Sequence, residues 1–400
     1  MQIPLVDGYR ADGSVDAEAT DWAAGSWVAG GLVGLPTETV YGLAADAQDA
    51  EAVGRVYRVK GRPPSHPLIV HIHGAHALAA WCAGSNPAAQ RLAEAFWPGA
   101  LTMIVRRNRR AGDFLTGGQD TVALRCPNHP VALACLEALG RETGDPARGV
   151  AAPSANRFGR VSPTRATDVL DELGARMDPQ RDLVVDGGRC TVGVESTIVD
   201  CTADPPRVLR LGAISQAQID AVLTAGPAPL SSPSPSTSAL PEFVEGEQKR
   251  GGRTEGGGSG GGDSDPVRVP GTLEVHYSPH ARVVLAERSA GGAAPSERAG
   301  KVHDPWGLST LGEQQSARIM ELAGVGETGL IAPADVATPV GWTRLSAPAT
   351  SDEYARDLYA ALRRADELGL ATVVAVLPGP AEGPLAHAVR DRLTRAAHGD

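Results

Sequence analysis

A stretch in the middle of the chain has almost nothing to bury, and it limits the fold more than any other feature. Residues 226–265 read GPAPLSSPSPSTSALPEFVEGEQKRGGRTEGGGSGGGDSD, a proline- and serine-rich half followed by a glycine-rich half. Such a composition is typical of linkers. It is not a phosphate loop, because no strand precedes the glycines and no Lys-Ser/Thr pair follows them. The chain therefore divides into an N-terminal domain (1–225), a linker (226–280) and a smaller C-terminal domain (281–400).

The composition excludes several classes of protein. Of 400 residues 42% are hydrophobic, which is enough for real cores, and the formal charge of −10 argues against a chain that coats nucleic acid. The first residues lack the basic-then-apolar pattern of a signal peptide, and no apolar run reaches the roughly 18 residues of a membrane span. We therefore expect a cytoplasmic protein without a membrane partner. The cysteines are odd in number and form no CxxC pair, which predicts reduced, mostly buried thiols: Cys82, Cys126, Cys135, Cys190 and Cys201.

Apolar runs and helical patterns alternate through the first domain. A helix is expected after Asp49, a second begins at Asn86-Pro87 as N-cap and first-turn proline, and a third has a capping box at Ser215. Many strands with interspersed helices predict an α/β domain with a twisted, mixed sheet. The expected strands are Leu32–Leu35, Leu68–Ile72, Leu101–Val105, Thr121–Cys126, Val150–Ala152, Leu183–Val185, Thr197–Cys201 and Val208–Leu211.

The C-terminal domain repeats this alternation on a smaller scale. Ala281–Ala286 predicts a strand, the run LATVVAVLPG predicts a buried strand, and Pro384–Ala397 predicts a closing helix. Between them SDEYARDLYAALRRADELG predicts an amphipathic helix. The pattern favours a small α/β module of Rossmann-like type.

Polar residues collect where the predicted strands of the first domain end. The run PTETVYGLAAD follows the first strand and contains two threonines around a glutamate. In YRVKGRPPSHPLIVHI, Lys60 and Arg62 end a helix, while His66 and His71 flank the next strand. The two cations fit either a favourable helix C-terminus or a polyphosphate. A lone histidine such as His71 is more often structural than ligand-binding.

Two further strand ends add cations and hydroxyls. Arg125 ends an apolar strand with Thr121 on the same face, and an arginine so near a core needs an anionic partner, internal or ligand. The run AAPSANRFGRVSPT places short hydroxyls and exposed backbone N–H groups after another strand, where they suit either a phosphate or an ordinary turn. The remaining candidates are Ser154, Asn156, Ser162, Ser196 and Arg210.

These loops together carry many cations and hydroxyls and few carboxylates. The chain offers no defensible Ser-His-Asp order and no HExxH or EF-hand spacing. The site therefore reads as a place that binds anions, without a strong protein nucleophile and without a protein-held metal.

The motifs PTETVYGLAAD, KGRPPSHPLIVHI, WPGALTMIV, VALRCP, APSANRFGRVSPT, GVESTIVD and RVLRLGAI occur in that order. They resemble the YrdC-type domain of L-threonylcarbamoyladenylate synthases over about residues 15–225. VPGTLEVHYSP, around 269–279, resembles the linker motif of the longer members of that family, and YARDLYAALRRADELG with HAVRDRLTRAA resembles the end of their second domain.

The resemblance implies an ATP-dependent nucleotidyltransferase. L-threonine, bicarbonate and ATP would give threonylcarbamoyl-AMP and pyrophosphate, and the product would serve the t6A modification of tRNA position 37. It implies a threonine and bicarbonate side made of Thr39, His71, Arg125 and Ser196. It implies a nucleotide side made of Lys60, Arg62, His66, Thr121, Ser154, Asn156, Ser162, Arg210 and Tyr277, with Lys60 and Arg62 neutralising charge during catalysis.

The family's chemistry fits the residues. No protein nucleophile is required, because the carbamate of threonine attacks the α-phosphorus of ATP. With so few acids available, any Mg²⁺ would be carried mainly by the ATP phosphates. Tyr277 would close over the nucleotide and exclude water, while Glu38 and Tyr41 would support the pocket. The expected partners beyond the substrates are tRNA and the transferase of the t6A machinery.

Two other hypotheses stay open at this point. One is an RNA-binding module of the same fold without synthase activity, suggested by the arginines of RRNRR at 106–110. The acidic total charge favours a solvated strand-end hairpin as the explanation of these arginines. The other is a carbamoyl-transfer relative of the hydrogenase-maturation type, which would carry acylphosphatase-like and zinc-finger segments that this chain lacks.

Overall fold

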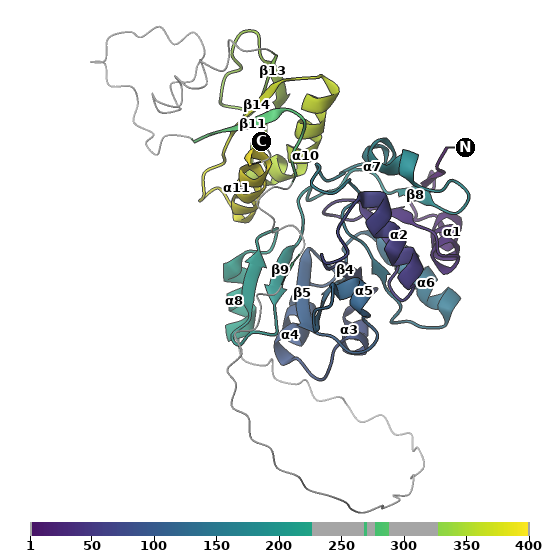
Figure 1. The fold of residues 1–400 in the computed structure, drawn as a ribbon. Helices are drawn as coiled ribbons and strands as arrows, with labels where there is room; N and C mark the ends of the chain where they lie inside the picture. The colour runs from purple at the N-terminus through teal and green to yellow at the C-terminus, as the bar shows by residue number, and fades with distance from the viewer. Residues whose placement is uncertain (1, 226–267, 270–276, 288–326, 399–400) are drawn as a thin grey trace, which may run out of the picture.

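The computed structural model describes residues 2–225, 268–269, 277–287 and 327–398 (Figure 1). The low-complexity stretch and most of the linker lie outside the described residues, so the expected lid motif is described only at residues 269 and 277–279.

The N-terminal domain is built on one mixed sheet, as the alternation of strands and helices predicted. Ten described strands lie in the order β1-β8-β2-β3-β7-β4-β6-β5-β9-β10. The sheet contains parallel pairs, such as β4 with β6, and antiparallel pairs, such as β5 with β6. The strands are β1 (Leu5–Asp7), β2 (Val33–Leu35), β3 (Gly42–Asp46), β4 (Ile69–His71), β5 (Leu101–Arg106), β6 (Thr121–Arg125), β7 (Val150–Ala151), β8 (Leu183–Asp186), β9 (Thr197–Asp200) and β10 (Arg207–Arg210).

The helices α1, α2, α4 and α8 of this domain begin at side-chain caps that the sequence encodes. Asp49 accepts hydrogen bonds from the backbone of Glu51 and Ala52, and Ser215 with Gln218 forms the expected capping box. The helices are α1 (Ala17–Val28), α2 (Ala50–Lys60), α3 (Leu78–Trp81), α4 (Pro87–Phe96), α5 (Asp113–Thr116), α6 (Pro130–Thr143), α7 (Ala166–Leu173) and α8 (Gln216–Thr224), with single 3₁₀ turns η1 (Ala75–Ala77) and η2 (Gly174–Arg176).

The two faces of the sheet are covered unequally. One face packs on α2, α3, α4, α7 and α8 through residues such as Val53, Trp81 and Leu92. On the other face α1 and α6 cover β2, β3 and β8, with Trp27 fully buried between them. The apolar cluster over β4, β5, β6 and β9 on that second face contains no residue of a described helix: Ile69, Ile104, Ala123, Ile198, Leu209 and Val269. The part of the second face over these strands is therefore available for a site.

Strand periodicity decides which residues point to this uncovered face. In β6, Val122 and Leu124 enter the main core, so Ala123 and Arg125 point the other way. In β4, Val70 is in the main core, and His71 therefore points to the same side as Arg125. The predicted site residues on neighbouring strands thus share one face of the sheet.

The C-terminal domain holds four parallel strands in the order β11-β14-β12-β13. The strands are β11 (Arg282–Ala286), β12 (Thr328–Ile331), β13 (Thr343–Ser346) and β14 (Thr372–Val376), and the described helices are α10 (Ser351–Glu367) and α11 (Pro384–Ala397). The expected strand at 281–286, the long helix and the closing helix are confirmed; β12 and β13 were not predicted. No helix among the described residues is both long and apolar enough to cross a membrane.

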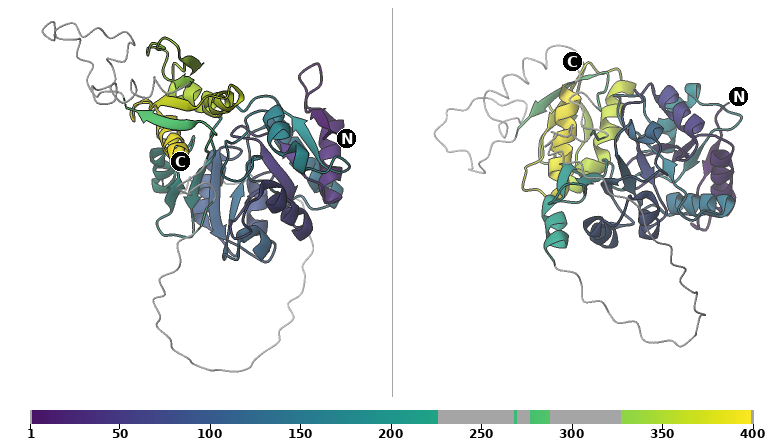
Figure 2. Two further views of the ribbon diagram at one scale, coloured as in Figure 1. Left: turned by 45° about the horizontal axis from the view of Figure 1, so that its top comes forward. Right: turned by 60° about the horizontal axis from the view of Figure 1, so that its bottom comes forward.

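The two domains share one apolar cluster. Figure 2 shows the C-terminal domain, in green to yellow, lying against the first domain. At this contact Val40, Val161 and Val194 of the first domain pack with α10 and α11 residues such as Leu358 and Leu393. Gly193 makes this approach close: a Cβ atom there would lie 2.4 Å from Cα of Arg356. The loop before β9 is therefore pressed against α10.

Candidate functional site

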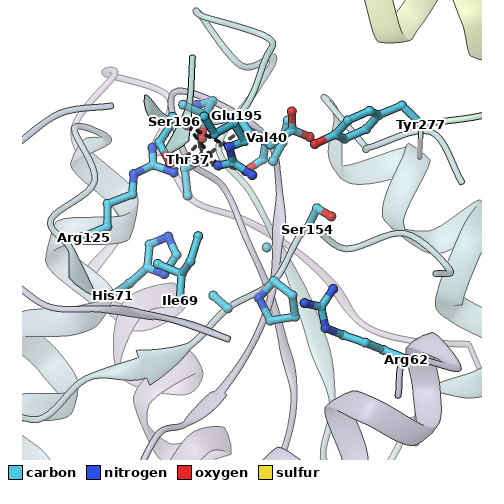
Figure 3. Close-up of a pocket in the computed structure, with 15 residues that line it drawn as sticks. Thr37, Val40, Arg62, Ile69, His71, Arg125, Ser154, Glu195, Ser196 and Tyr277 are labelled. Carbon is cyan, nitrogen blue, oxygen red and sulfur yellow. Dashed lines mark hydrogen bonds between the residues drawn. The ribbon is translucent and has the colours of Figure 1, made fainter. Parts of the chain in front are cut away.

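A pocket lined mostly by buried residues lies on the face of the sheet over β4 and β6, which no described helix of the first domain covers (Figure 3). It lies near the contact between the two domains. Figure 3 shows Arg125 and His71 on one side, Arg62 across the pocket, and Ser154 between them. Eight residues expected from the sequence line it: Thr39, Arg62, His71, Arg125, Ser154, Ser196, Arg210 and Tyr277. The other lining residues are Thr37, Val40, Gly42, Ile69, Ala152, Pro153 and Glu195.

Five expected site residues do not line the pocket. Lys60 is buried and donates to the carbonyls of Ser154 and Asn156. Asn156 donates to the carbonyls of Arg157 and Arg160. Ser162 donates to Glu195 over 2.7 Å. The remaining two are His66, which packs edge-on against Phe158, and Thr121, at the start of β6.

The threonine-rich run forms a tight connection between β2 and β3. The Thr37 hydroxyl donates to the carbonyl of Val40 over 2.6 Å and accepts hydrogen bonds from the backbone of Thr39 and Val40. The Tyr41 hydroxyl donates to the carbonyl of Gly188 over 2.7 Å, as expected for a supporting residue. The hydroxyls therefore satisfy an irregular backbone, which leaves Thr39 facing the pocket.

Arg125 has an internal anionic partner that the sequence did not identify. Its Nη2 lies 2.8 Å from Oε1 of Glu38, and its Nη1 donates to the Thr39 hydroxyl over 2.8 Å. The alignment of the ion pair is not that of a hydrogen bond, so the buried oxygens of Glu38 lack a hydrogen-bond donor among the described residues. Glu38 fixes where Arg125 lies, and Arg125 still lines the pocket.

His71 is a neutral side chain in this setting. Burial, and then the charge of Arg125, lowers the pKa of His71 from 6.5 to about 3. Its Nδ1 atom is buried and has no hydrogen-bond partner in the described part of the chain. A neutral imidazole beside Arg125 avoids a second positive charge and can accept a hydrogen bond from a bound amine.

The cationic residues across the pocket are held by backbone carbonyls. Arg62 donates to the carbonyl of Pro67 over 3.0 Å and lies over the Phe158 ring. Burial lowers the pKa of Arg62 to about 10, so its guanidinium stays charged at neutral pH. Lys60 lies behind Ser154, where burial and then Arg62 lower its pKa well below the usual range. The charged guanidinium of Arg62 therefore creates positive potential, and its hydrogen bond leaves the side chain little freedom.

A third set of polar groups belongs to the loop before β9 and to the end of β10. The Ser196 hydroxyl lies 2.7 Å from that of Thr102, and Arg210 donates to the Ser196 carbonyl over 3.0 Å and to its hydroxyl over 3.2 Å. Glu195 is the carboxylate that lines the pocket, and the sequence predicted no role for it. Its only sequence signal was its place next to Ser196 in GVESTIVD.

Tyr277 reaches the pocket from the linker. Its ring stacks on that of Tyr359 with centroids 5.5 Å apart, and it is 1% exposed. Its φ of 65° is the one positive value at a non-glycine residue in the described part of the chain, which indicates a backbone held by its surroundings. The cavity that remains has a volume of about 50 Å³.

Two of the four arginines of RRNRR form ion pairs with nearby carboxylates. Arg107 pairs with Asp113, and Arg110 pairs with Asp145 over 2.7 Å while it lies over the Trp81 ring. This arrangement is that of a solvated strand end with local partners, and it does not favour the RNA-binding alternative. In addition, no cluster of three metal-binding side chains exists among the residues that the structure describes.

Comparison with known proteins covers nearly the whole chain. The Sua5–YciO–YrdC family profile, described as "Telomere recombination", matches residues 26–212, and a profile described as "Threonylcarbamoyl-AMP synthase, C-terminal domain" matches residues 214–398. Threonylcarbamoyl-AMP synthase of Pyrococcus abyssi (strain GE5 / Orsay) is 32% identical over 375 residues, which cover 94% of this chain and 93% of that protein.

Two further similarities agree with this match. Threonylcarbamoyl-AMP synthase of Bacillus subtilis (strain 168) is 45% identical over 193 residues, 48% of this chain and 53% of that protein. Among solved structures, the crystal structure of P. abyssi Sua5 complexed with L-threonine has a TM-score of 0.73 and 29% identity, and the alignment covers 99% of this chain and 98% of that one.

Proposed function

The chain belongs to the threonylcarbamoyl-AMP synthase family, and from that premise we propose that the pocket joins L-threonine, bicarbonate and ATP into threonylcarbamoyl-AMP with release of pyrophosphate. One observation supports the assignment of this reaction to the pocket. Buried arginines, Arg125 and Arg62, line it from opposite sides, and the hydroxyls of Thr39, Ser154 and Ser196 line it as well. Such a site suits two anionic substrates whose reacting ends must meet.

The reaction balances without a covalent enzyme intermediate. The threonine amine adds to bicarbonate and loses water, which gives a carbamate. A carbamate oxygen then attacks the α-phosphorus of ATP, and the bond to the pyrophosphate leaving group breaks. Negative charge gathers on the phosphoryl oxygens during that step, so fixed guanidinium groups lower its barrier.

We assign the side of Arg125 to threonine and bicarbonate. The guanidinium of Arg125 is oriented by Glu38 and Thr39 and would bind the threonine carboxylate. The neutral imidazole of His71 would accept a hydrogen bond from the amine, and Ser196 would donate to the carboxylate or carbamate. Threonine would then lie with its amine toward the centre of the pocket.

We assign the opposite side to the nucleotide. Arg62, Ser154 and Arg210 would contact ATP, because they line the pocket and offer hydrogen-bond donors. Lys60, His66, Thr121, Asn156 and Ser162 would act mainly by holding these side chains and loops, and Lys60 does so through the carbonyls of Ser154 and Asn156.

A magnesium ion would arrive with the nucleotide. Magnesium prefers oxygen ligands and keeps several waters, and the carboxylate in the pocket, Glu195, already accepts hydrogen bonds from Ser162, Tyr359 and Arg392. The residues present therefore fit a metal held by phosphate oxygens, with no protein carboxylate as its main ligand. Bound there, it would neutralise phosphate charge.

The linker would open and close the site. Ligand pockets for small molecules typically measure about 300–1,000 Å³, far more than the space under Tyr277. ATP would therefore need Tyr277 to move before it enters, and renewed closure would protect the carbamic–phosphoric anhydride from water. This role favours a functional boundary after residue 225, with residues 226–280 as linker and 281–400 as the C-terminal domain.

The product points to the t6A pathway of tRNA modification. We propose that the protein works in the cytoplasm and passes threonylcarbamoyl-AMP to a transferase that modifies adenosine 37 of tRNA. Direct contact with tRNA or with that transferase would be tested by co-purification with each.

Pyrophosphate release from ATP tests the function. It is measured with and without L-threonine and with and without bicarbonate, and L-serine serves as the control amino acid. The proposal expects release that requires both threonine and bicarbonate and that falls about a hundredfold in Arg125→Ala, because the threonine carboxylate then lacks its charged partner. Release that ignores threonine, or no release from folded protein that binds ATP, would overturn it.

A further inference from the structure

We propose that Arg392 and Tyr359 of the C-terminal domain are positioning residues for the nucleotide side of the pocket, acting through Glu195. Both side chains contact a residue that lines the pocket, and neither lines it itself. The inference deepens the proposed function: it gives the second domain a chemical task in ATP binding.

The carboxylate of Glu195 carries negative charge in a pocket that we propose to bind anionic substrates. It is buried, lines the site and would repel phosphate groups if its charge were left alone. Its Oε2 accepts from Arg392 Nε over 2.9 Å and from the Tyr359 hydroxyl over 2.8 Å. The C-terminal domain therefore supplies the charge and one of the hydroxyl donors that make this carboxylate tolerable.

The protonation of Glu195 agrees with this reading. Burial alone would raise the pKa of Glu195, but Arg392, Arg210 and the hydrogen bonds outweigh it and lower the pKa to about 2. Glu195 is therefore an anion at neutral pH, and it lies close enough to two guanidinium groups to influence both. Arg392 forms the direct ion pair with this carboxylate, while Arg210 donates its hydrogen bonds to Ser196.

Arg392 also ties together two backbone segments of the pocket, one that carries Arg210 of the nucleotide side and one that carries Ser196 of the threonine side. Its Nη2 donates to the carbonyl of Leu211 over 3.0 Å, while its Nε binds Glu195. Leu211 directly follows Arg210, and Glu195 directly precedes Ser196. One fully buried guanidinium thus clamps the neighbours of Ser196 and Arg210, which are themselves hydrogen-bonded to each other.

The same two residues support the linker tyrosine. The Tyr277 ring stacks on Tyr359, and the Arg392 guanidinium lies 5.4 Å from the Tyr277 ring centre. Tyr359 of α10 and Arg392 of α11 therefore contact both Glu195 and Tyr277. Loss of these two side chains would disturb the binding of the nucleotide more than the binding of threonine by Arg125 and His71.

ATP affinity of the full chain, measured by calorimetry, tests the inference together with pyrophosphate release. Arg392→Ala is expected to weaken ATP binding and raise the KM for ATP by about tenfold or more, with a smaller change in the KM for threonine. Glu195→Gln in the Arg392→Ala background should restore much of the loss, because it removes the uncompensated charge. The ATP affinity of Arg392→Lys should lie between those of Arg392→Ala and the wild type.

Arg390→Ala is the matched control. Arg390 precedes Arg392 by two positions on α11, but it binds the carbonyl of Pro378 and Glu287 inside its own domain. Tyr359→Phe keeps the ring and removes one donor to Glu195, so it tests the same contact if Arg392→Ala fails to fold. It should weaken ATP binding about threefold.

The outcomes separate the two proposals. A wild-type chain that binds ATP but releases no pyrophosphate with threonine and bicarbonate would overturn the synthase assignment, and the ATP affinities of the variants would still decide the present inference. ATP affinity within about twofold of wild type in folded Arg392→Ala or Tyr359→Phe would overturn the inference. So would a failure of Glu195→Gln to restore binding.

Discussion

Glu38 and Arg125 form an ion pair in which Oε1 and Nη2 are 2.8 Å apart and the side chains are 7% and 5% exposed. The two residues are far apart in the chain, and the pairing joins the connection between β2 and β3 to the end of β6. Arg125 therefore meets a substrate in a fixed orientation, because its other contact, with Thr39, comes from the same connection. The cost of burying the guanidinium is offset before any ligand binds.

Loss of this partner should destabilise the protein strongly. Glu38→Gln keeps the shape of the side chain and removes its charge, which leaves Arg125 buried without an anion. Breaking a buried pair in this way costs about 3–5 kcal/mol of unfolding free energy. Urea unfolding measures the change. Asp21→Asn, which removes the partner of Arg141 in an exposed pair, should cost less than about 1 kcal/mol. Equal effects of the two changes would contradict the role of Glu38.

Stability should fall with decreasing pH because of His71. Its folded pKa of about 3 lies below the ordinary value of 6.5, so the unfolded chain takes up a proton first as the pH drops. The effect is absent above pH 6.5 and grows as the pH falls toward 3. At pH 5 it should lower the unfolding free energy by about 2 kcal/mol relative to pH 7.5, from about 1.4 kcal/mol per pKa unit.

The variant His71→Gln isolates this contribution. Its unfolding free energy should change less between pH 7.5 and pH 5 than that of the wild type, by the same 2 kcal/mol or so. Urea unfolding at both pH values gives the comparison. Identical pH profiles for the two proteins would mean that His71 is protonated in the folded state, and the neutral imidazole would be rejected.

Gly193 should be far less tolerant of a side chain than Gly188. Both have φ near +80°, at 81° and 80°, so the backbone strain on alanine is the same. A Cβ at Gly193 would lie 2.4 Å from Cα of Arg356 and 2.6 Å from the Ala355 carbonyl, whereas a Cβ at Gly188 meets no atom within 4 Å. Gly193→Ala must therefore push α10 away from the loop that carries Glu195.

The comparison is made on kcat/KM for ATP in pyrophosphate release. Gly193→Ala is expected to lose about tenfold or more, because the displaced α10 carries Tyr359, and Gly188→Ala should lose much less. Similar losses in both variants would show that strain alone matters, and the close docking of α10 would then have no part in the reaction.

Tyr277 should control how much product survives. Tyr277→Ala removes the ring that stacks on Tyr359 and leaves the pocket open to water. The variant should release pyrophosphate while several-fold less threonylcarbamoyl-AMP is recovered, since the anhydride is hydrolysed in the site. Chromatography of the nucleotides measures both yields.

The matched control for this change is Tyr277→Phe. It keeps the ring against Tyr359 and under the Arg392 guanidinium, so its product yield should stay near that of the wild type. A Tyr277→Ala variant with the wild-type ratio of product to pyrophosphate would rule out closure by this residue.

Local rules made much of the fold readable from the sequence. The strands at 69–71, 101–106 and 121–125 follow from apolar runs, and the helices after Asn86 and Ser215 follow from their caps. The sequence did not predict the strands β1, β3, β12 and β13 or the helices α1, α3, α5, α6 and α7. β3 was hidden because it follows the threonine-rich run, which read as a strand end and is a connection between antiparallel strands.

The sequence by itself determined the chemistry that this chain can offer. It set the residue types at the strand ends, the family motifs that carry them, and the faces on which Arg125 and His71 must lie, because side chains alternate along a strand whatever surrounds it. Such features depend on neighbours a few residues away, and those neighbours are visible in the chain.

Only the tertiary structure decided which of these groups meet. It placed Arg62 on the pocket and Lys60 behind it, gave Arg125 the partner Glu38, and brought Arg392 to Glu195 from another domain. The last contact joins residues 197 positions apart. No local preference encodes such a pairing, because it exists only after both domains have packed, when burial makes an unpaired charge costly.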